Sequence, residues 1–311
     1  GAASASCRAT PPPRTLGSMR TFCWFLLLMA LALAAIAVGS YPAWLLLHPH
    51  FDFPFHRMGE RIGMLALLVG FVLLARRLGL ADRKSLGYGV PRRAFLRELS
   101  VGLALGVASM LAVVAAMSAL GLLDWTRFAA LSGGALLKLI VLRLFSGLAV
   151  GFIEETFLRG AMHTGIERES GTTAAVTLTA LVYAATHFFA SYHIAPAQVS
   201  AHSGVDLLLG TVHAFAHPGQ IADAFMALLA VGVLLGLVRA ATGNIAACIG
   251  LHAGWVWIML VVHELSQPRR EAPGGFLLSR FDGFVGWLVF AWIVVLALPL
   301  VRFYQRRSAR A

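Results

Sequence analysis

The feature that most constrains the fold is a series of long apolar segments that recurs along the whole chain. A helix needs about 20 apolar residues to cross the hydrocarbon core of a bilayer. Segments of about this length lie near 22–47, 61–80, 98–123, 136–166, 172–190, 221–241, 244–264 and 283–303. The chain is 59% apolar and only 13% charged, whereas soluble domains are about 45–50% apolar and about 25% charged. The sequence therefore predicts an all-α, polytopic transmembrane helical bundle of about eight spans.

The N-terminal region contains two different kinds of sequence. Residues 1–18 are rich in Pro, Ser and Ala, which predicts a disordered tail. We expect Met19 to be the natural start. Arg20 and the apolar run after it resemble a signal peptide, but the run continues to Leu47. This length favours a first transmembrane helix over a cleaved signal.

The charge distribution predicts the orientation of the bundle. The formal net charge is +11, and the Lys and Arg residues gather in the 76–97 loop, in both tails and at span ends such as Arg239. An even number of spans puts both tails on one side, and basic loops stay in the cytoplasm. We therefore expect cytoplasmic termini and a C-terminal tail that contacts anionic lipid. No stacking or groove-reading motif is present, which argues against a nucleic-acid partner.

Cysteine and histidine patterns give little support for a metal. Cys7, Cys23 and Cys248 are scattered, so they predict neither a disulfide framework nor a CxxC pair. His213 and His217 in the long loop 191–220 have a spacing that would suit a metal only on a helix. Ordinary polar loop residues are the simpler interpretation.

The stretch GFIEETFLRG (151–160) places two carboxylates inside an apolar span. Ionisable groups in a span cost several kcal/mol unless they are paired or solvated, so they are functional candidates. Glu155 and Arg159 are four residues apart, so a helix brings them together as an ion pair. Glu154 points elsewhere and needs another partner or water, which is the condition under which a carboxylate serves as a general base.

Two histidines are candidates to face Glu154. The sequence ERESGTT (167–173) predicts a turn between two spans, and Glu154 precedes its centre by as many residues as His187 follows it. In an antiparallel hairpin these side chains lie at the same depth, and Tyr183 shares a face with His187. His252 lies two apolar spans after that of His187, in the predicted span 244–264. A lone buried histidine is as often a packing residue, but together the three favour a shared polar site.

These residues resemble the motifs of the CAAX prenyl protease and bacteriocin-processing (CPBP, or Abi) family of intramembrane glutamate endopeptidases. Glu154-Glu155-Thr-Phe-Leu-Arg159 matches EExxxR. Tyr183-Ala-Ala-Thr-His187 is similar to FxxxH, and His252 matches the histidine of HxxxN or HxxxD, although Val256 replaces the Asn or Asp. The resemblance divides the chain into N-terminal helices (19–135), a catalytic core (136–264) and a final helix with a basic tail (265–311).

The resemblance implies a metal-independent CAAX prenyl endopeptidase-like hydrolase. Glu154 would be the general base, His187 would hold the attacking water, and His252 would bind the substrate carbonyl. Glu155, Arg159 and Tyr183 would orient the site. Since Val256 offers no donor, the oxyanion or substrate contacts would come from Trp255, Trp257, Asn244 or His252 itself. The substrate would be a membrane-embedded or lipidated protein or peptide, and the Ala, Arg and Leu bias suggests a bacterial inner (plasma) membrane.

Three other interpretations remain open at this point. Glu154, His187 and His252 form a chemically reasonable zinc set, although no HExxH motif is present. A non-catalytic membrane scaffold or bacteriocin-immunity-type protein of the same family would explain Val256. A transporter could use Glu154 and His187 as a proton relay, but repeated halves and matching broken helices are not evident.

Overall fold

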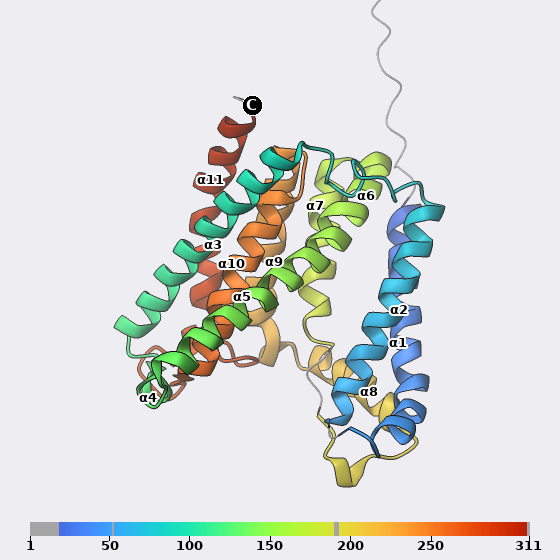
Figure 1. Ribbon diagram of the computed structural model, residues 1–311, viewed down its shortest axis with the longest axis vertical. Helices are drawn as coiled ribbons and strands as arrows, with labels where there is room; N and C mark the ends of the chain where they lie inside the picture. The colour runs from blue at the N-terminus through green and yellow to red at the C-terminus, as the bar shows by residue number, and fades with distance from the viewer. Residues whose placement is uncertain (1–18, 52, 190–192, 310–311) are drawn as a thin grey trace, which may run out of the picture.

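The computed structural model describes residues 19–51, 53–189 and 193–309. Its helices pack side by side, as Figure 1 shows, and within these residues only one short pair of strands accompanies them. The long helices are α1 (Arg20–Leu47), α2 (Phe55–Arg77), α3 (Arg92–Ala119), α5 (Gly133–Glu155), α7 (Thr172–Thr186), α9 (Pro218–Thr242), α10 (Ala246–Leu265) and α11 (Trp287–Ser308). The shorter elements are β1 (Leu123–Asp124), α4 (Thr126–Ala129), the π-helix η1 (Thr156–Met162), α6 (His163–Ser170), η2 (Pro196–Gln198), α8 (Ser203–Ala216), β2 (Gln267–Pro268) and η3 (Gly275–Leu277). Strands β1 and β2 are antiparallel.

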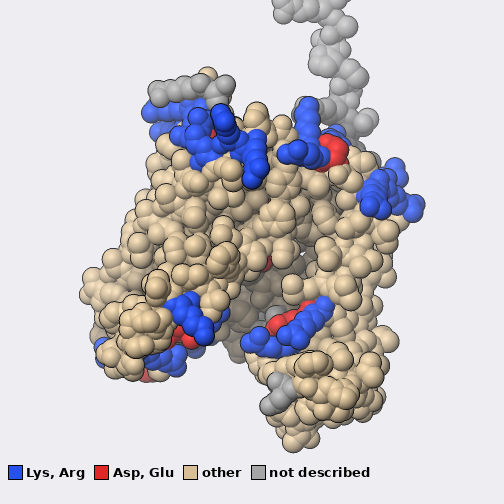
Figure 2. All heavy atoms as spheres, in the orientation of Figure 1, with Lys and Arg blue, Asp and Glu red and all other residues tan. Residues whose placement is uncertain are grey.

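The all-α membrane architecture predicted from the sequence is confirmed. Within the described residues, seven helices are long and apolar enough to cross a membrane, including one continuous stretch over Gly133–Ser170. The chain is therefore an integral membrane protein. Both described ends lie at the same end of the bundle (Figure 1). Figure 2 shows Lys and Arg side chains gathered mainly at that end, above a broad apolar belt.

The fifth predicted span is wrong in its length. The sequence predicts a span over 172–190, but α7 covers only Thr172–Thr186, which is 15 residues. At about 1.5 Å per residue that helix is about 22 Å long, short of the ~30 Å hydrocarbon core. The helix ends where the His187 ring turns back to bond the Tyr183 carbonyl. The predicted loop 191–220 also contains a helix, α8.

The bundle has two packed regions. A small cluster of Trp44, Phe55 and Leu207 joins α1, α2 and α8. The main core joins α3, α7, α9, α10 and α11, and it also includes buried residues of α1, α2, η1 and α6. The tight turn at Gly171 (φ +85°) folds α6 back onto α7. Figure 2 shows a hollow on the face between the α1–α2 half and the α3–α5–α10 half.

Helices α3 and α10 approach so closely that only glycine fits between them. A Cβ on Gly250 would lie 2.6 Å from the Leu103 amide nitrogen and would also collide with the Leu99 carbonyl. Gly102 and Gly254 are similarly blocked by backbone atoms of the facing helix. Such small residues let transmembrane helices pack backbone to backbone, and here they fix α10, which carries His252.

We expect Gly250→Ala to lower the stability of the protein, because the backbone atoms around the new methyl group have no room to move. The cost should be about 1–3 kcal/mol, as for other overpacked sites. The measurement is the thermal unfolding midpoint in detergent. Gly134→Ala is the matched control, since no atom lies within 4 Å of its added Cβ. Equal midpoints for both variants would contradict the packing argument.

Candidate active site

The two adjacent carboxylates lie at the junction of α5 with the π-helix η1. Glu154 and Glu155 end α5, and Arg159 lies within η1. A π-helical turn inserts an extra residue into a helix and is frequent at functional sites. Here it widens the turn directly after the carboxylates. The residue pattern contains no signal for this change in helix type.

Glu155 forms the ion pair that its spacing predicts. Its Oε1 lies 2.9 Å from Arg159 Nη1, and both side chains are 0% exposed. Arg159 also donates to the Gly232 carbonyl of α9 at 3.1 Å. Its guanidinium stacks over the Tyr183 ring, with Cζ 4.7 Å from the centroid. Glu155 is therefore neutralised within a rigid, fully buried group.

His252 lies between the two carboxylates. Its Nδ1 is 2.8 Å from Glu155 Oε1, and its Nε2 is 3.9 Å from Glu154 Oε2. A carboxylate only accepts hydrogen bonds, so Nδ1 carries the proton and Nε2 faces Glu154. Glu154 is 35% exposed on its side chain, whereas His252 is 2% exposed. The predicted hairpin joins the spans of Glu154 and His187 only. It therefore does not predict that Glu154 lies close to His252, which belongs to α10.

His187 lies at the C-terminal cap of α7, in the same neighbourhood. Its Nδ1 is 2.7 Å from the Tyr183 carbonyl oxygen. The carbonyl can only accept, so Nδ1–H donates and Nε2 keeps a lone pair. The Tyr183 ring contacts both His187 and His252, and the two histidines line the same cavity. The structure thus brings together the carboxylate and both histidines that the sequence singles out.

A mainly apolar cavity of about 220 Å³ adjoins these residues. Its polar lining includes His187, His252, Tyr183, Ser109 and Asp282. Apolar side chains from α3, α5, α9, α10 and α11 form most of the remaining wall, Val256 among them. The cavity can hold an apolar group with one end against the two imidazoles.

The residues predicted to replace a donor at position 256 are engaged elsewhere. Trp255 Nε1 donates to Ser109 Oγ at 2.8 Å, and Trp257 Nε1 donates to the Ile140 carbonyl at 2.9 Å. Asn244 donates to the Thr242 carbonyl at 3.0 Å and accepts from the Ala246 amide at the start of α10. These bonds assign all three side chains to helix packing and capping in this structure.

The zinc alternative requires a particular arrangement of donors. A catalytic zinc takes three protein ligands at about 2.0–2.2 Å from one point. Among the described residues, no three His, Cys, Asp or Glu side chains are placed to hold a metal. His213 lies on α8 and His217 lies just beyond it, with ring centroids 4.2 Å apart. The two do not share one helix, as a chelating pair at this spacing would require.

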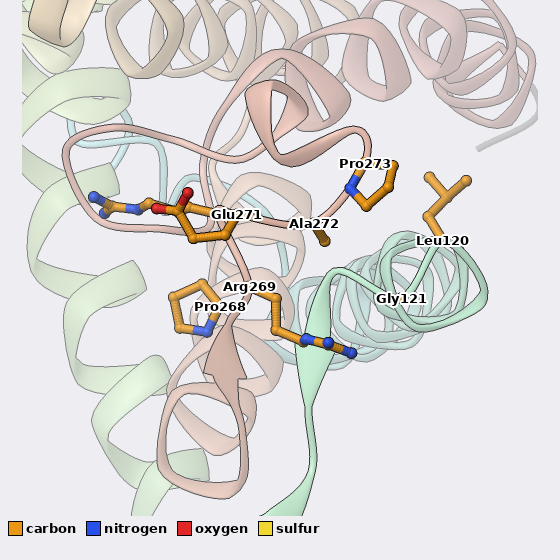
Figure 3. Close-up of a pocket in the computed structure, with 8 residues that line it drawn as sticks. Leu120, Gly121, Pro268, Arg269, Glu271, Ala272 and Pro273 are labelled. Carbon is orange, nitrogen blue, oxygen red and sulfur yellow. The ribbon is translucent and has the colours of Figure 1, made fainter.

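A second, larger pocket lies away from the carboxylates. Its volume is about 740 Å³, and it is an open depression between the Leu120–Gly121 turn and the 268–273 loop (Figure 3). Its charged residues are Arg269, Arg270 and Glu271. Of the described residues that line it, none is a histidine and none belongs to the motifs. Size alone therefore does not identify the chemical site.

Arg239 has a structural role that the charge pattern alone does not indicate. The pattern counts it among the basic residues of the cytoplasmic side, and the structure shows that it is buried, with 6% exposure. Its Nε donates to the Arg159 carbonyl at 3.0 Å, and its Nη2 donates to Thr164 Oγ1 at 3.2 Å. Arg239, which lies on α9, thus holds the π-helix η1 in place through its bond to the Arg159 carbonyl. The sequence signal that could have indicated a buried Arg239 is its position directly after the apolar run VLLGLV.

Comparison with known proteins gives a match to a protein family. Residues 136–258 match the model of the type II CAAX prenyl endopeptidase Rce1-like family. Comparisons with curated proteins and with solved structures found no match. The matched segment contains Glu154, His187 and His252, while α3 and α11, which complete the cavity, lie outside it. The predicted resemblance is therefore confirmed for this segment: residues 136–258 are similar to the Rce1-like type II CAAX prenyl endopeptidase family, in agreement with the CPBP motifs.

Proposed function

We propose that this protein is an intramembrane endopeptidase that hydrolyses a peptide bond with a water activated by Glu154. The observation that carries the proposal is that the two adjacent carboxylates, Glu154 and Glu155, differ in burial and in hydrogen-bonded partners. Glu155 is sealed and paired with Arg159 and His252, whereas Glu154 is partly exposed and has no hydrogen-bonded cation among the described residues. A carboxylate in that situation is free to take a proton from water.

The two histidines would have complementary roles. The His187 Nε2 lone pair accepts a hydrogen bond from the same water and holds it near Glu154. His252, oriented by Glu155 through Nδ1, presents Nε2 towards Glu154 and the substrate carbonyl. Protonated at Nε2, it would donate to the oxygen that gains negative charge. In a water-poor cavity each of these interactions is stronger than in bulk water.

The covalent steps balance without a cofactor. The water oxygen attacks the carbonyl carbon, Glu154 takes the water proton, and the carbonyl π electrons move to oxygen. The tetrahedral intermediate then collapses, the C–N bond breaks, and Glu154 returns the proton to the leaving amine. The products are an amine and a carboxylic acid, which then loses its remaining proton to become a carboxylate.

The substrate class follows from the setting of the site. The cavity beside His187 and His252 is mainly apolar and lies within a bundle of membrane-spanning helices. A substrate that is membrane-embedded or lipidated would place its apolar part there and its peptide bond against the histidines. We place the protein in a bacterial plasma membrane with both termini cytoplasmic.

The test is cleavage by the purified protein in proteoliposomes. The substrates are a farnesylated peptide with its modified cysteine fourth from the C terminus, and a library of membrane-protein peptides. We expect cleavage by the wild type that an excess of chelator leaves unchanged, because the mechanism uses no metal. Loss of cleavage with chelator, restored by zinc, would contradict it and favour the zinc site.

One observation favours a second function. Val256 lines the cavity where a donor would be useful, one turn after His252. A non-catalytic scaffold or immunity-type protein would tolerate that loss. No cleavage of any substrate by a stably folded wild type would favour this alternative.

A further inference from the structure

The Tyr183 ring is held in contact with both histidines of the site. It packs edge-to-face against His187 and His252, with centroid distances of 4.5 Å and 5.7 Å. The Arg159 guanidinium covers its face at 4.7 Å. These three contacts come from three different parts of the chain, so the direction of the phenol is fixed before any substrate binds.

The hydroxyl of this tyrosine has no partner inside the part of the protein that the structure describes. Tyr183 is 3% exposed and lines the cavity. No described group hydrogen-bonds its hydroxyl, yet its oxygen is not among the side-chain atoms that are sealed without a partner. The oxygen therefore opens onto the cavity. A phenol hydroxyl is a hydrogen-bond donor, so this one is free to donate to a group that enters the cavity.

Hydrolysis at this site needs a donor besides His252. Preorganised N–H or O–H groups aimed at the developing oxyanion are usually a large part of catalysis. Val256 has none, and the Trp255 indole donates to Ser109. The Ser109 hydroxyl donates to the Gly106 carbonyl at 3.0 Å. Trp292 Nε1 is unpartnered, but it belongs to α11 and has no ring contact with either histidine among the described residues.

We infer that the Tyr183 hydroxyl is a catalytic residue of this site, donating a hydrogen bond to the oxyanion together with His252. The inference rests on the proposed function. As water attacks the carbonyl carbon, the C=O π electrons move to oxygen, and the phenol O–H shares its hydrogen with that oxygen without giving it up. The bond is released when the C–N bond breaks. Tyr183 thereby supplies the donor that Val256 does not.

The experiment compares Tyr183→Phe with the wild type on the farnesylated peptide in proteoliposomes. Only the hydroxyl is removed, so the ring contacts with Arg159 and both histidines remain. We expect kcat to fall about 100-fold, as for loss of one oxyanion donor, with KM and the thermal unfolding midpoint unchanged. Tyr304→Phe removes a hydroxyl by the same substitution from another buried tyrosine with no partner among the described residues, and Tyr304 does not line the cavity, so this variant should retain full kcat.

A double variant tests whether the Tyr183 hydroxyl acts as an oxyanion donor or only supports the structure. Adding Val256→Asn to Tyr183→Phe places an amide one turn after His252, and we expect at least about a tenfold recovery of kcat, since one donor replaces another. A loss in Tyr183→Phe that Val256→Asn leaves untouched would overturn the oxyanion role. Full activity of Tyr183→Phe would overturn this inference alone. Failure of the wild type to cleave any substrate would overturn the proposed function and this inference with it.

Discussion

Glu154→Gln is expected to lower kcat by about 10²–10⁴-fold, the range in which loss of a general base falls. The amide has nearly the same size as the carboxylate, but it cannot take a proton from water. Since Glu154 has no hydrogen-bonded cation among the described residues and is 35% exposed, its charge is not needed to hold the fold. The measurement is the steady-state rate of peptide cleavage, with the thermal unfolding midpoint determined in parallel.

The matched control for this change is Glu264→Gln. Glu264 lies at the C-terminal end of α10, is 48% exposed, and pairs with Arg143 near the surface. This variant loses the same charge through the same substitution, but Glu264 lies more than three helical turns after His252 on α10, so its rate should equal that of the wild type. Substantial cleavage by Glu154→Gln would remove the general base from the mechanism and direct attention to His187.

The candidate site could be predicted from the sequence because its chemistry is unusual for its setting. Carboxylates and histidines in apolar spans are costly unless they serve a purpose, and an i,i+4 spacing already joins Glu155 to Arg159. The hairpin argument also predicted that Glu154 and His187 lie at the same depth, because an antiparallel turn fixes relative depth. None of this required knowledge of how the other helices pack.

Other features depend on tertiary contacts that no local pattern encodes. The π-helix η1 keeps the residue types of an α-helix and is stabilised from α9, through Arg239 on the Arg159 carbonyl. Helix α7 ends at Thr186, although apolar residues continue through Phe188 and Phe189, so apolar content alone does not give its length. The bond from Trp255 to Ser109 joins α10 to α3, a helix that the family match does not cover.

Arg159→Met is expected to destabilise the fold more than any other single change discussed above. It would leave the Glu155 carboxylate fully buried, with Oε2 already lacking a partner among the described residues, and it would remove the bond to the Gly232 carbonyl. Breaking one side of a buried ion pair costs about 3–5 kcal/mol, because the remaining charge is uncompensated. The measurement is the thermal unfolding midpoint in detergent, with the yield of folded protein as a second readout.

Arg143→Met is the control, because Arg143 pairs with Glu264 where both side chains are partly exposed, and such pairs contribute about 0–1 kcal/mol. Comparable losses for the two variants would show that side-chain volume, not the orphaned charge, causes the effect.

The double variant Glu155→Gln/Arg159→Met tests the cause directly. The amide oxygen that replaces the Glu155 carboxylate would still accept the His252 hydrogen bond but carries no charge, so most of the lost stability should return. A double variant as unstable as Arg159→Met would show that the charge is not the cause. Activity should return less than stability, because a neutral amide supports a protonated His252 less well than a carboxylate does, and the same imidazole must stabilise the oxyanion.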